Sequence, residues 1–375
     1  MKRKILVWET LGIVSGGQKM TLAVMDMLAD EYDFHCLIPT EGPLSEELKK
    51  RNISYTLLGD QTMPTGVKGK SVIFRYAWLS LKAVVKGLFA VIKEKPQTIY
   101  APGPAALPWS AVVGLLTGKK VIWHLHHIFL DGATKKLLNL CSGFGCVKSI
   151  IAVSDCVGEQ IQNEKGKLKT TTVYNPVDFE RFSSGDGEKI KKELALTSKD
   201  VVIGHVALLQ ELKKQSFVLE VAKELKTLGK SVKVIFAGRA RDEDKWYEEK
   251  LKNEVSELGL ENAVVFLGHR TDIPDILKAV DVIMIPSAFE GFPLAGLEAA
   301  SAGTPVVACD RAGAEEFIRV SLAGAVFKED NVKDAVEKVL AVIADRNAFS
   351  ENGKAFANTC DMKSYQDSIK GVFGG

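Results

Sequence analysis

Two glutamates, Glu290 and Glu298, lie on either side of the point where a loop is expected to become a helix. The loop at 287–294 contains Gly and Pro, and it leads into residues that favour helix. The free N–H groups of a first helical turn bind phosphate oxygens without a metal. Glu298 falls on an apolar helix face, where a carboxylate needs donors such as vicinal hydroxyls. The pattern predicts a nucleotide ligand, and an ordinary amphipathic surface helix is the alternative.

This segment resembles the Glu-x7-Glu signature of the retaining glycosyltransferases of family four. Other landmarks follow in the family's order between about residues 4 and 345: Gly16-Gly17, WHLH at 123–126, IAVS at 151–154, YNPVD at 174–178, FLG at 266–268 and DVIMIPS at 281–287. The resemblance implies an α/β protein of GT-B fold, with two facing Rossmann-like domains and a cleft between them. It also implies sugar transfer from a nucleoside-diphosphate sugar, with retention of configuration and no covalent nucleophile.

The same resemblance implies residue roles. The expected catalytic residues are His126 beside the reacting sugar, Lys213 at the diphosphate and Glu290 near the donor sugar. The other expected donor-binding positions are Gly16, Gly17, Gly291, Phe292, Pro293, Leu294 and Glu298, together with His269 and Arg270, where the family uses the backbone and the Arg270 side chain stays unassigned. Arg239 is added to them from its place at the end of a strand, as a candidate substitute for a cation of the family pattern. Neighbouring His124, His126 and His127 could also bind zinc, but no fourth ligand has matching spacing, so no metal or other cofactor is expected.

One landmark departs from the family pattern. The family has Gly-Arg-Leu where this chain has Ala-Leu-Leu at 207–209. Ala207 thus replaces the Gly and Leu208 stands at the Arg position, although Lys213 is retained. Because the leaving diphosphate gains negative charge, a missing guanidinium weakens transition-state stabilisation unless Lys214 or Arg239 replaces it. Two other functions therefore stay open. They are a non-catalytic nucleotide-sugar-binding partner subunit, and a GT-B sugar-nucleotide epimerase, which needs a carboxylate acid/base pair near the anomeric centre.

The 375 residues, 46% of them hydrophobic, predict two domains. We expect a first domain at 1–182 that binds the acceptor and a second at 188–358 that binds the nucleotide sugar, with a helix at about 360–375 packing back on the first. The polar segment 183–188 is the expected linker. Short apolar runs alternate with helical patterns, as in parallel α/β sheets. The expected strands are 4–8, 34–38, 98–101, 120–124, 149–153, 171–174, 201–207, 232–237, 263–267, 282–285 and 305–308.

The charge distribution indicates the partners. Net charge is only +2, yet residues 66–150 contain twelve Lys or Arg and two acidic residues. Within 68–95, aromatic residues including Phe74, Tyr76 and Trp78 occur among lysines at helical spacing, which is typical of docking on an anionic membrane surface. A helix that buries its apolar side on the sheet is the alternative. The expected acceptor is then a lipid-linked saccharide of bacterial capsule or O-antigen synthesis. Nucleic acid is not an expected partner.

The expected location is the cytoplasm, peripheral at the inner face of the cell membrane. The N-terminal segment has too few apolar residues for a signal peptide, and no run of eighteen apolar residues is present. The six cysteines show no Cys-x-x-Cys spacing and are expected to be reduced thiols. The expected donor base is uracil or guanine.

Overall fold

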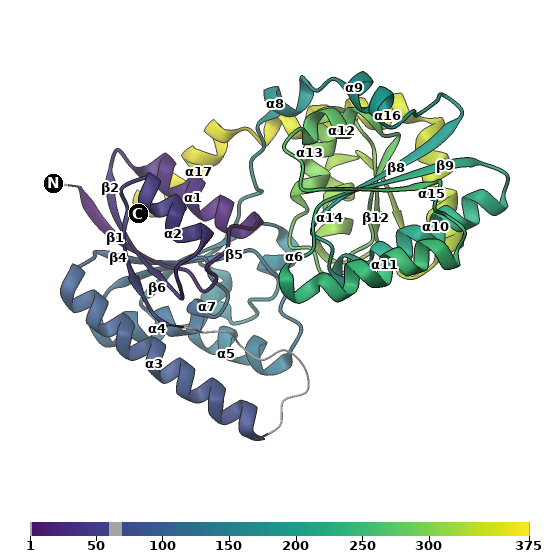
Figure 1. Cartoon of the computed structure of the whole chain (residues 1–375). Helices are drawn as coiled ribbons and strands as arrows, with labels where there is room; N and C mark the ends of the chain where they lie inside the picture. Colours follow the sequence, from purple (N-terminus) through teal and green to yellow (C-terminus); the bar gives the residue numbers. More distant parts are fainter. Residues whose placement is uncertain (1, 60–69, 375) are drawn as a thin grey trace. The chain divides into compact units, whose positions relative to one another are not determined.

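The computed structural model describes residues 2–59 and 70–374 (Figure 1). The chain forms two compact units, Met1–Tyr174 with Gln366–Gly375, and Asn175–Tyr365. The first unit thus ends before the expected boundary at residue 182. Helix α8 (Phe179–Ser183) packs on α12 (Ile273–Ala279) and α13 (Leu294–Ala302) of the second unit, which explains the earlier boundary. In the described parts of the chain, no helix has the length and hydropathy needed to cross a bilayer.

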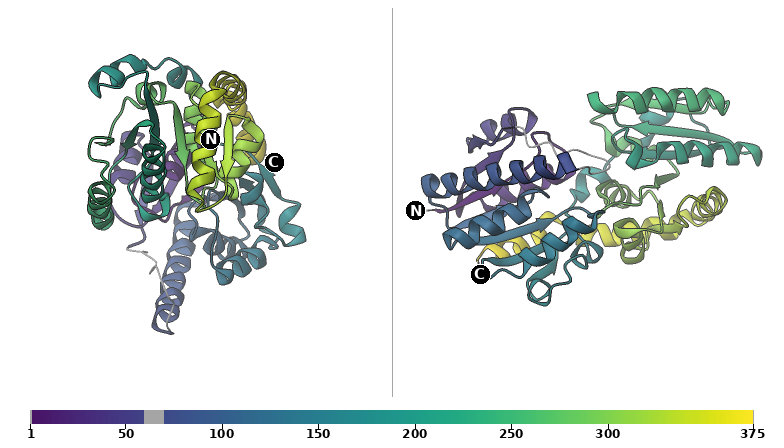
Figure 2. Two further views of the ribbon diagram at one scale, coloured as in Figure 1. Left: turned by 90° about the vertical axis from the view of Figure 1, so that its right-hand side faces the viewer. Right: turned by 90° about the horizontal axis from the view of Figure 1, so that it is seen from below.

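The first unit contains a seven-stranded parallel sheet in the order β3-β2-β1-β4-β5-β6-β7. Its strands are β1 (Arg3–Trp8), β2 (Tyr32–Ile38), β3 (Ser54–Leu57), β4 (Thr98–Ala101), β5 (Lys120–Leu125), β6 (Val147–Ala152) and β7 (Thr170–Thr172). Its helices are α1 (Gly16–Leu28), α2 (Pro43–Lys50), α3 (Lys70–Glu94), α4 (Ala106–Thr117), α5 (Gly132–Ser142), α6 (Asp155–Gly158), α7 (Glu164–Lys167) and the larger part of α17 (Met362–Gly374). In the views of Figures 1 and 2, α1, α2 and α17 cover one face of the sheet, and α3, α4 and α5 cover the other.

The second unit contains a six-stranded parallel sheet in the order β10-β9-β8-β11-β12-β13. Its strands are β8 (Asp200–Val206), β9 (Ser231–Ala237), β10 (Val264–Gly268), β11 (Val282–Ile285), β12 (Val306–Cys309) and β13 (Gly324–Phe327). Besides α8, α12 and α13, its helices are α9 (Gly187–Glu193), α10 (Gln215–Thr227), α11 (Lys245–Glu257), α14 (Ala312–Ser321), α15 (Val332–Ala344), α16 (Arg346–Thr359) and the short 3-10 helices Glu211–Lys213 and Asp242–Asp244. Buried Phe217, Phe236 and Phe327 belong to its core.

Both sheets reverse their strand order beside their first strand, at β1/β4 and at β8/β11. Ligands of such sheets bind beyond the carboxyl ends of the strands at this switch point. The eleven strands expected from the sequence are confirmed, with ends that differ by a few residues at most. The two strands that the sequence did not indicate, β3 and β13, are the short edge strands of their sheets.

The contact between α3 and β1 gives the first testable prediction. A Cβ atom added at Gly87 of α3 would lie 2.3 Å from Cη2 of buried Trp8. We expect Gly87→Ala to lower the free energy of unfolding by about 1–3 kcal/mol, because the indole is enclosed and cannot retreat. Gly371→Ala in α17 is the matched control, since its Cβ would meet no atom within 4 Å. Equal urea midpoints for Gly87→Ala and wild type would show that the contact is not tight.

Candidate functional site

The second unit joins two of the expected catalytic residues directly. The Lys213 Nζ and Glu290 Oε1 atoms are 2.6 Å apart, and both side chains are partly buried. Lys213 ends the turn after β8, and Glu290 lies in the loop between β11 and α13. The adjacent strands β8 and β11 thus bring together a cation and a carboxylate that are far apart in the sequence. This pair lies at the carboxyl ends of the strands that flank the switch point.

The main chain of the Glu290 loop is held by the start of α14. The Gly313 N–H donates to the Glu290 carbonyl at 3.0 Å. A Cβ atom at Gly313 would lie 1.9 Å from the Gly291 carbonyl oxygen, so only glycine permits this approach. Gly313 was missed in the sequence, where its only signal is a glycine shortly after a strand. It fixes the loop that carries Glu290.

Helix α13 begins directly after this loop. Gly291, Phe292 and Pro293 are buried, and Leu294 is the first residue of the helix. No side chain caps its N-terminus in the described residues. Glu298 is partly exposed, whereas its neighbours Leu297 and Ala299 are buried. A carboxylate at the edge of a small-residue helix face is thus placed within reach of a ligand.

The other expected donor-binding residues have different surroundings. Arg239 and His269 follow β9 and β10 and are exposed. Arg270 binds Asp272 and Glu193, and these hydrogen bonds raise its pKa, with the Asp272 bond the larger cause. Its guanidinium is occupied by these partners. Lys214, one possible replacement for the missing arginine, binds Glu329 and Asp330 at 3.1 and 2.7 Å.

A buried histidine, His205, was also missed in the sequence. It lies on β8, and its Nδ1 is 2.9 Å from the Met284 carbonyl of β11. Because a carbonyl only accepts, Nδ1 carries the proton and Nε2 is an acceptor. Burial lowers the pKa of His205 to about 4, so the ring is neutral at pH 7. His205 therefore holds β8 to β11 beneath the loops of Lys213 and Glu290.

The first unit places Gly16, Gly17 and His126 at the carboxyl ends of its strands. Gly16 and Gly17 open α1 after β1, and His126 follows β5. A Cβ atom at Gly17 would lie 4.0 Å from the His126 ring. The His126 and His124 rings are in contact, with centroids 4.0 Å apart, and Tyr100 Oη lies 2.7 Å from His124 Nδ1. The turn and the histidine that the sequence analysis named are therefore neighbours.

Burial determines the protonation of these histidines. It lowers the pKa of His124 to about 3, and it lowers that of His126, with smaller contributions from His124 and His127. Both rings are neutral at pH 7. Nε2 of each is buried without a partner among the described residues. Over the same residues, no group of three His, Cys, Asp or Glu side chains is arranged to hold a metal ion.

A buried carboxyl group braces the Gly16-Gly17 turn. Glu9, only 2% exposed, follows β1 and accepts hydrogen bonds from Thr21 Oγ1 at 2.6 Å and Gln18 Nε2 at 3.1 Å. Gln18 Oε1 in turn accepts from Ser15 Oγ at 2.5 Å. Burial raises the pKa of Glu9, and the two hydrogen bonds offset part of this shift. The strand, the turn and the first helix are therefore fixed to one another through side chains.

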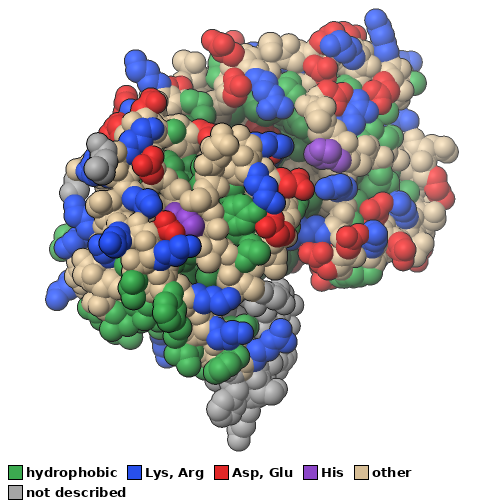
Figure 3. Space-filling view, turned by 60° about the vertical axis from the view of Figure 1, so that its left-hand side comes forward, with side chains coloured by type: hydrophobic (Ala, Val, Ile, Leu, Met, Phe, Trp, Pro, Cys, Tyr) green, Lys and Arg blue, Asp and Glu red, His purple; other side chains and the backbone are tan. Residues whose placement is uncertain are grey.

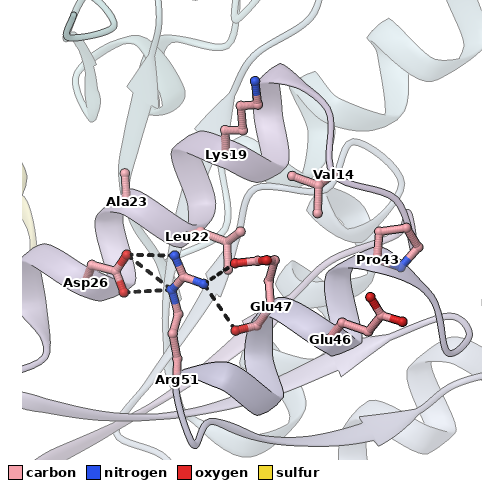
Figure 4. A pocket seen from close by; sticks show the side chains of 9 residues that line it. All are labelled: Val14, Lys19, Leu22, Ala23, Asp26, Pro43, Glu46, Glu47 and Arg51. Carbon is pink, nitrogen blue, oxygen red and sulfur yellow. Dashed lines mark hydrogen bonds and ion pairs between the residues drawn. The ribbon is translucent and has the colours of Figure 1, made fainter. Parts of the chain in front are cut away.

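The groove between α1 and α2 is a second feature of the first unit (Figure 4). It has a volume of about 470 Å³. Arg51 binds Asp26 and Glu47 across it, while Lys19 points away from these partners. The Arg51 guanidinium in the groove is therefore already bound by two carboxylates.

Comparison with known proteins identifies the family. Residues 14–181 match the model of the family described as Glycosyltransferase Family 4, and residues 186–356 match that of Glycosyl transferases group 1. The crystal structure of Anabaena HepE in complex with UDP superposes with a TM-score of 0.81 at 22% identity, over 99% of both chains. The chain belongs to the GT-B glycosyltransferases. The fold expected from the sequence is confirmed for each of the two domains.

Relatives of this glycosyltransferase include bacterial enzymes named for a diphosphoundecaprenol-linked acceptor and for lipopolysaccharide core synthesis. The chain is 25% identical, over 99% of its own length and 97% of the relative, to the Escherichia coli UDP-Gal:alpha-D-GlcNAc-diphosphoundecaprenol alpha-1,3-galactosyltransferase. It is 30% identical to the Rhizobium meliloti lipopolysaccharide core biosynthesis mannosyltransferase LpsB, over 50% of this chain and 55% of that protein. The lipopolysaccharide outer core galactosyltransferase WaaB has the same fold, with a TM-score of 0.73 at 17% identity over 99% of both chains.

The raised pKa of Glu9 predicts how the stability of this glycosyltransferase depends on pH. A carboxyl whose folded pKa exceeds its unfolded value ionises first in the unfolded chain, so wild type loses stability as pH rises from about 4.5 towards the folded pKa. Glu9→Gln cannot ionise. The free energy of unfolding of Glu9→Gln minus that of wild type should therefore increase as pH rises from about 4.5 towards the folded pKa of Glu9. The increase is at most about 1.4 kcal/mol per pH unit.

Urea denaturation at a series of pH values between 4 and 8 measures this difference. Glu46→Gln, at an exposed glutamate of α2, controls for the change in net charge. A difference that stays constant or decreases over the window would contradict the raised pKa of Glu9.

Proposed function

We propose that the protein is a retaining glycosyltransferase that moves a sugar from a UDP- or GDP-linked donor to a lipid-linked saccharide in bacterial cell-surface polysaccharide synthesis, such as capsule or O-antigen. The observation that carries this proposal is the Lys213–Glu290 pair beside the N-terminus of α13. The E. coli relative, aligned over nearly the whole chain, is named for a UDP-sugar and a diphosphoundecaprenol-linked acceptor. That name supports the donor and acceptor classes.

The proposed donor site uses charges of the second domain. The α13 N-terminus and Lys213 bind the diphosphate, and together they replace a divalent cation. In the free protein Glu290 holds the Lys213 ammonium. When the diphosphate binds, its oxygens take over that ammonium, and the Glu290 carboxylate becomes available to the sugar hydroxyls. Glu298 accepts hydrogen bonds from the ribose hydroxyls.

Retention follows in this proposal from the leaving group itself. As the glycosidic bond breaks, a phosphate oxygen accepts the proton of the attacking acceptor hydroxyl, and the new bond forms on the same face of the sugar. His126 is neutral and therefore hydrogen-bonds sugar hydroxyls without adding charge. We assign acceptor binding to the first domain, which carries His126 and the Gly16-Gly17 turn.

Lys213→Ala tests the assignment. We expect it to reduce transfer from the sugar nucleotide by about 100-fold or more, because a preorganised charge at the leaving group contributes about 3–4 kcal/mol. Glu298→Gln should weaken binding of the free nucleoside diphosphate, measured by calorimetry, since the amide loses the charge assistance. Lys214→Ala is the matched control, because this neighbouring lysine is engaged with Glu329 and Asp330.

Transfer to a lipid-linked acceptor should persist in EDTA. Activity that EDTA abolishes and magnesium or manganese restores would contradict the metal-free site. A wild-type protein that binds sugar nucleotides but transfers to no acceptor, and in which Lys213→Ala binds as well as wild type, would identify a non-catalytic partner subunit instead.

Helix α3 provides the support for a membrane partner. Its buried residues Ala83, Gly87, Ala90 and Val91 face the rest of the domain, and three of them are small. Five large apolar residues lie on the exposed side. They occur every three or four residues, and we call them the α3 stripe: Trp78, Leu81, Val85, Phe89 and Ile92. Trp78 is 60% and Phe89 68% exposed. A row of bulky apolar side chains thus faces solvent, which the alternative of a helix that buries its apolar side does not explain.

Basic residues accompany the α3 stripe. Arg75, Lys82 and Lys93 are exposed on the same helix, and exposed Lys95 follows its last residue. The helices α4 and α5, which pack in sequence beside α3, add exposed leucines at 115, 116, 137 and 140. In Figure 3 hydrophobic side chains gather at the lower left, with Lys and Arg beside them. Apolar side chains bordered by cations match the surface of an anionic bilayer, which we propose as the partner, at the cytoplasmic face of the cell membrane.

Two expectations about this surface change. Lys86, expected to face the lipid, instead donates to the Leu58 carbonyl at 2.6 Å, because it lies on the side of the helix turned towards β3. Lys68 lies outside the described residues, and so do the side chains of Lys70, Phe74 and Tyr76. The cations that remain for lipid binding are therefore those that border the α3 stripe.

Vesicle co-sedimentation tests this surface. Wild type should bind vesicles containing phosphatidylglycerol, with weaker binding at high salt, and should not bind neutral vesicles. Phe89→Ser with Ile92→Ser, or Lys82→Glu with Lys93→Glu, should reduce binding at least tenfold, since each lysine near the surface contributes about 1 kcal/mol. Leu168→Ser, at an isolated leucine that is 89% exposed, is the control. Dimers that dissociate in the Phe89/Ile92 variant would indicate a second copy as the partner.

A further inference from the structure

Three cations of the second domain that could bind the diphosphate of the proposed donor already form ion pairs with carboxylates. Lys213 binds Glu290, and Lys214 binds Glu329 and Asp330. Arg270 is held between Glu193 and Asp272. Each of these ammonium or guanidinium groups is already balanced by at least one carboxylate. A leaving group with two charged phosphates is stabilised further by a cation that no carboxylate already binds.

Arg239 meets this requirement. It is the second residue after β9, at the carboxyl end of the strand, and its side chain is exposed. Among residues 2–59 and 70–374, the Arg239 guanidinium lies near the Asp242 carboxylate but forms no ion pair with it. Asp242 is instead paired with Lys245 at 2.8 Å. The hydrogen bond from Lys245 lowers the pKa of Asp242, and Arg239 adds a smaller contribution. A guanidinium at this edge of a parallel sheet can bind two phosphate oxygens through parallel N–H groups.

The register of β8 and β9 places Arg239 beside Leu208. Val206 pairs with Ala237 in the ladder. The bonding continues beyond both strands, because the Leu209 N–H donates to the Arg239 carbonyl at 3.2 Å. This bond makes Leu208 the residue opposite Arg239. Paired residues of adjacent parallel strands project to the same side of the sheet, and we infer that the two side chains share a face at this edge.

The segment after β8 and the segment after β9 approach each other closely, and this fixes the arrangement. A Cβ atom at Gly238 would lie 1.8 Å from the Ala207 carbonyl oxygen, so only glycine fits between the turns. Gln215 Nε2 donates to the Leu208 carbonyl at 2.9 Å and ties the same turn to the start of α10. The backbone that carries Arg239 is therefore held rigidly against the turn that leads to Lys213.

We propose that Arg239 is the second cation of the diphosphate site, supplied from β9 at the position next to Leu208 of β8. The inference rests on the proposed function, since it names a residue of the same donor site. It explains how a leucine is tolerated at 208: the charge comes from the neighbouring strand, and Leu208 leaves space for it.

Calorimetry with UDP and GDP on the full chain tests the proposal. Arg239→Ala should weaken binding of the nucleoside diphosphate by roughly 10- to 100-fold, the effect of losing charge-assisted hydrogen bonds. Binding of the corresponding nucleoside, which lacks phosphates, should not change. Arg241→Ala is the matched control, because this nearby arginine lies 3.8 Å from the Glu243 carboxylate.

A relocated charge provides the sharper test. Leu208→Arg in the Arg239→Ala background should recover most of the lost affinity, whereas Leu208→Met in that background should recover none. No recovery with arginine would overturn the shared face. Wild-type affinity of Arg239→Ala for UDP and GDP, or an equal loss for the nucleoside, would overturn the role of Arg239. Failure of wild type to bind either nucleotide would instead overturn the proposed function.

Discussion

The ion pair between Lys213 and Glu290 joins the two loops on which the proposed donor site depends. Its partners are 77 positions apart in the chain, and only the adjacency of β8 and β11 brings them together. His205 fastens the same two strands from below, and Gly313 holds the Glu290 loop from the side. The free protein thus keeps its two charges in mutual contact. A ligand with anionic oxygens and hydroxyls can replace each half of that contact.

Much of this architecture is predictable from the sequence, because parallel strands that are buried on both faces are continuous apolar runs. Runs such as 282–285 meet that condition and were found. The missed strands β3 and β13 are edge strands of four residues. The sequence of β3, SYTL, has no continuous apolar run, and that of β13, GAVF, is apolar but too short to be separated from its surroundings. Glu9 and His205 were missed for another reason. Each is a polar residue at the end of an apolar run, and only the folded structure supplies its partners.

Helix α3 shows a different limit of periodicity. Apolar residues at helical spacing predict an amphipathic helix, but they do not reveal which face packs on the sheet. Here the Trp8 indole leaves room for nothing larger than Gly87, so the small residues turn inwards. The large residues are then excluded from the interior by shape and not by polarity. A pattern that records only hydrophobicity cannot distinguish these two arrangements.

The C-terminal helix has a consequence for biosynthesis. Phe373 packs edge-to-face on Tyr32 and Tyr100, and its carbonyl accepts the Tyr32 hydroxyl at 3.1 Å. These contacts complete the core of the domain that begins at the N-terminus. The first domain can therefore finish folding only after the second domain, which lies before Gln366–Gly375 in the chain, has been synthesised, whereas the second domain is contiguous at Asn175–Tyr365 and has no such dependence. The order of completion of the two domains is then the reverse of their order of synthesis.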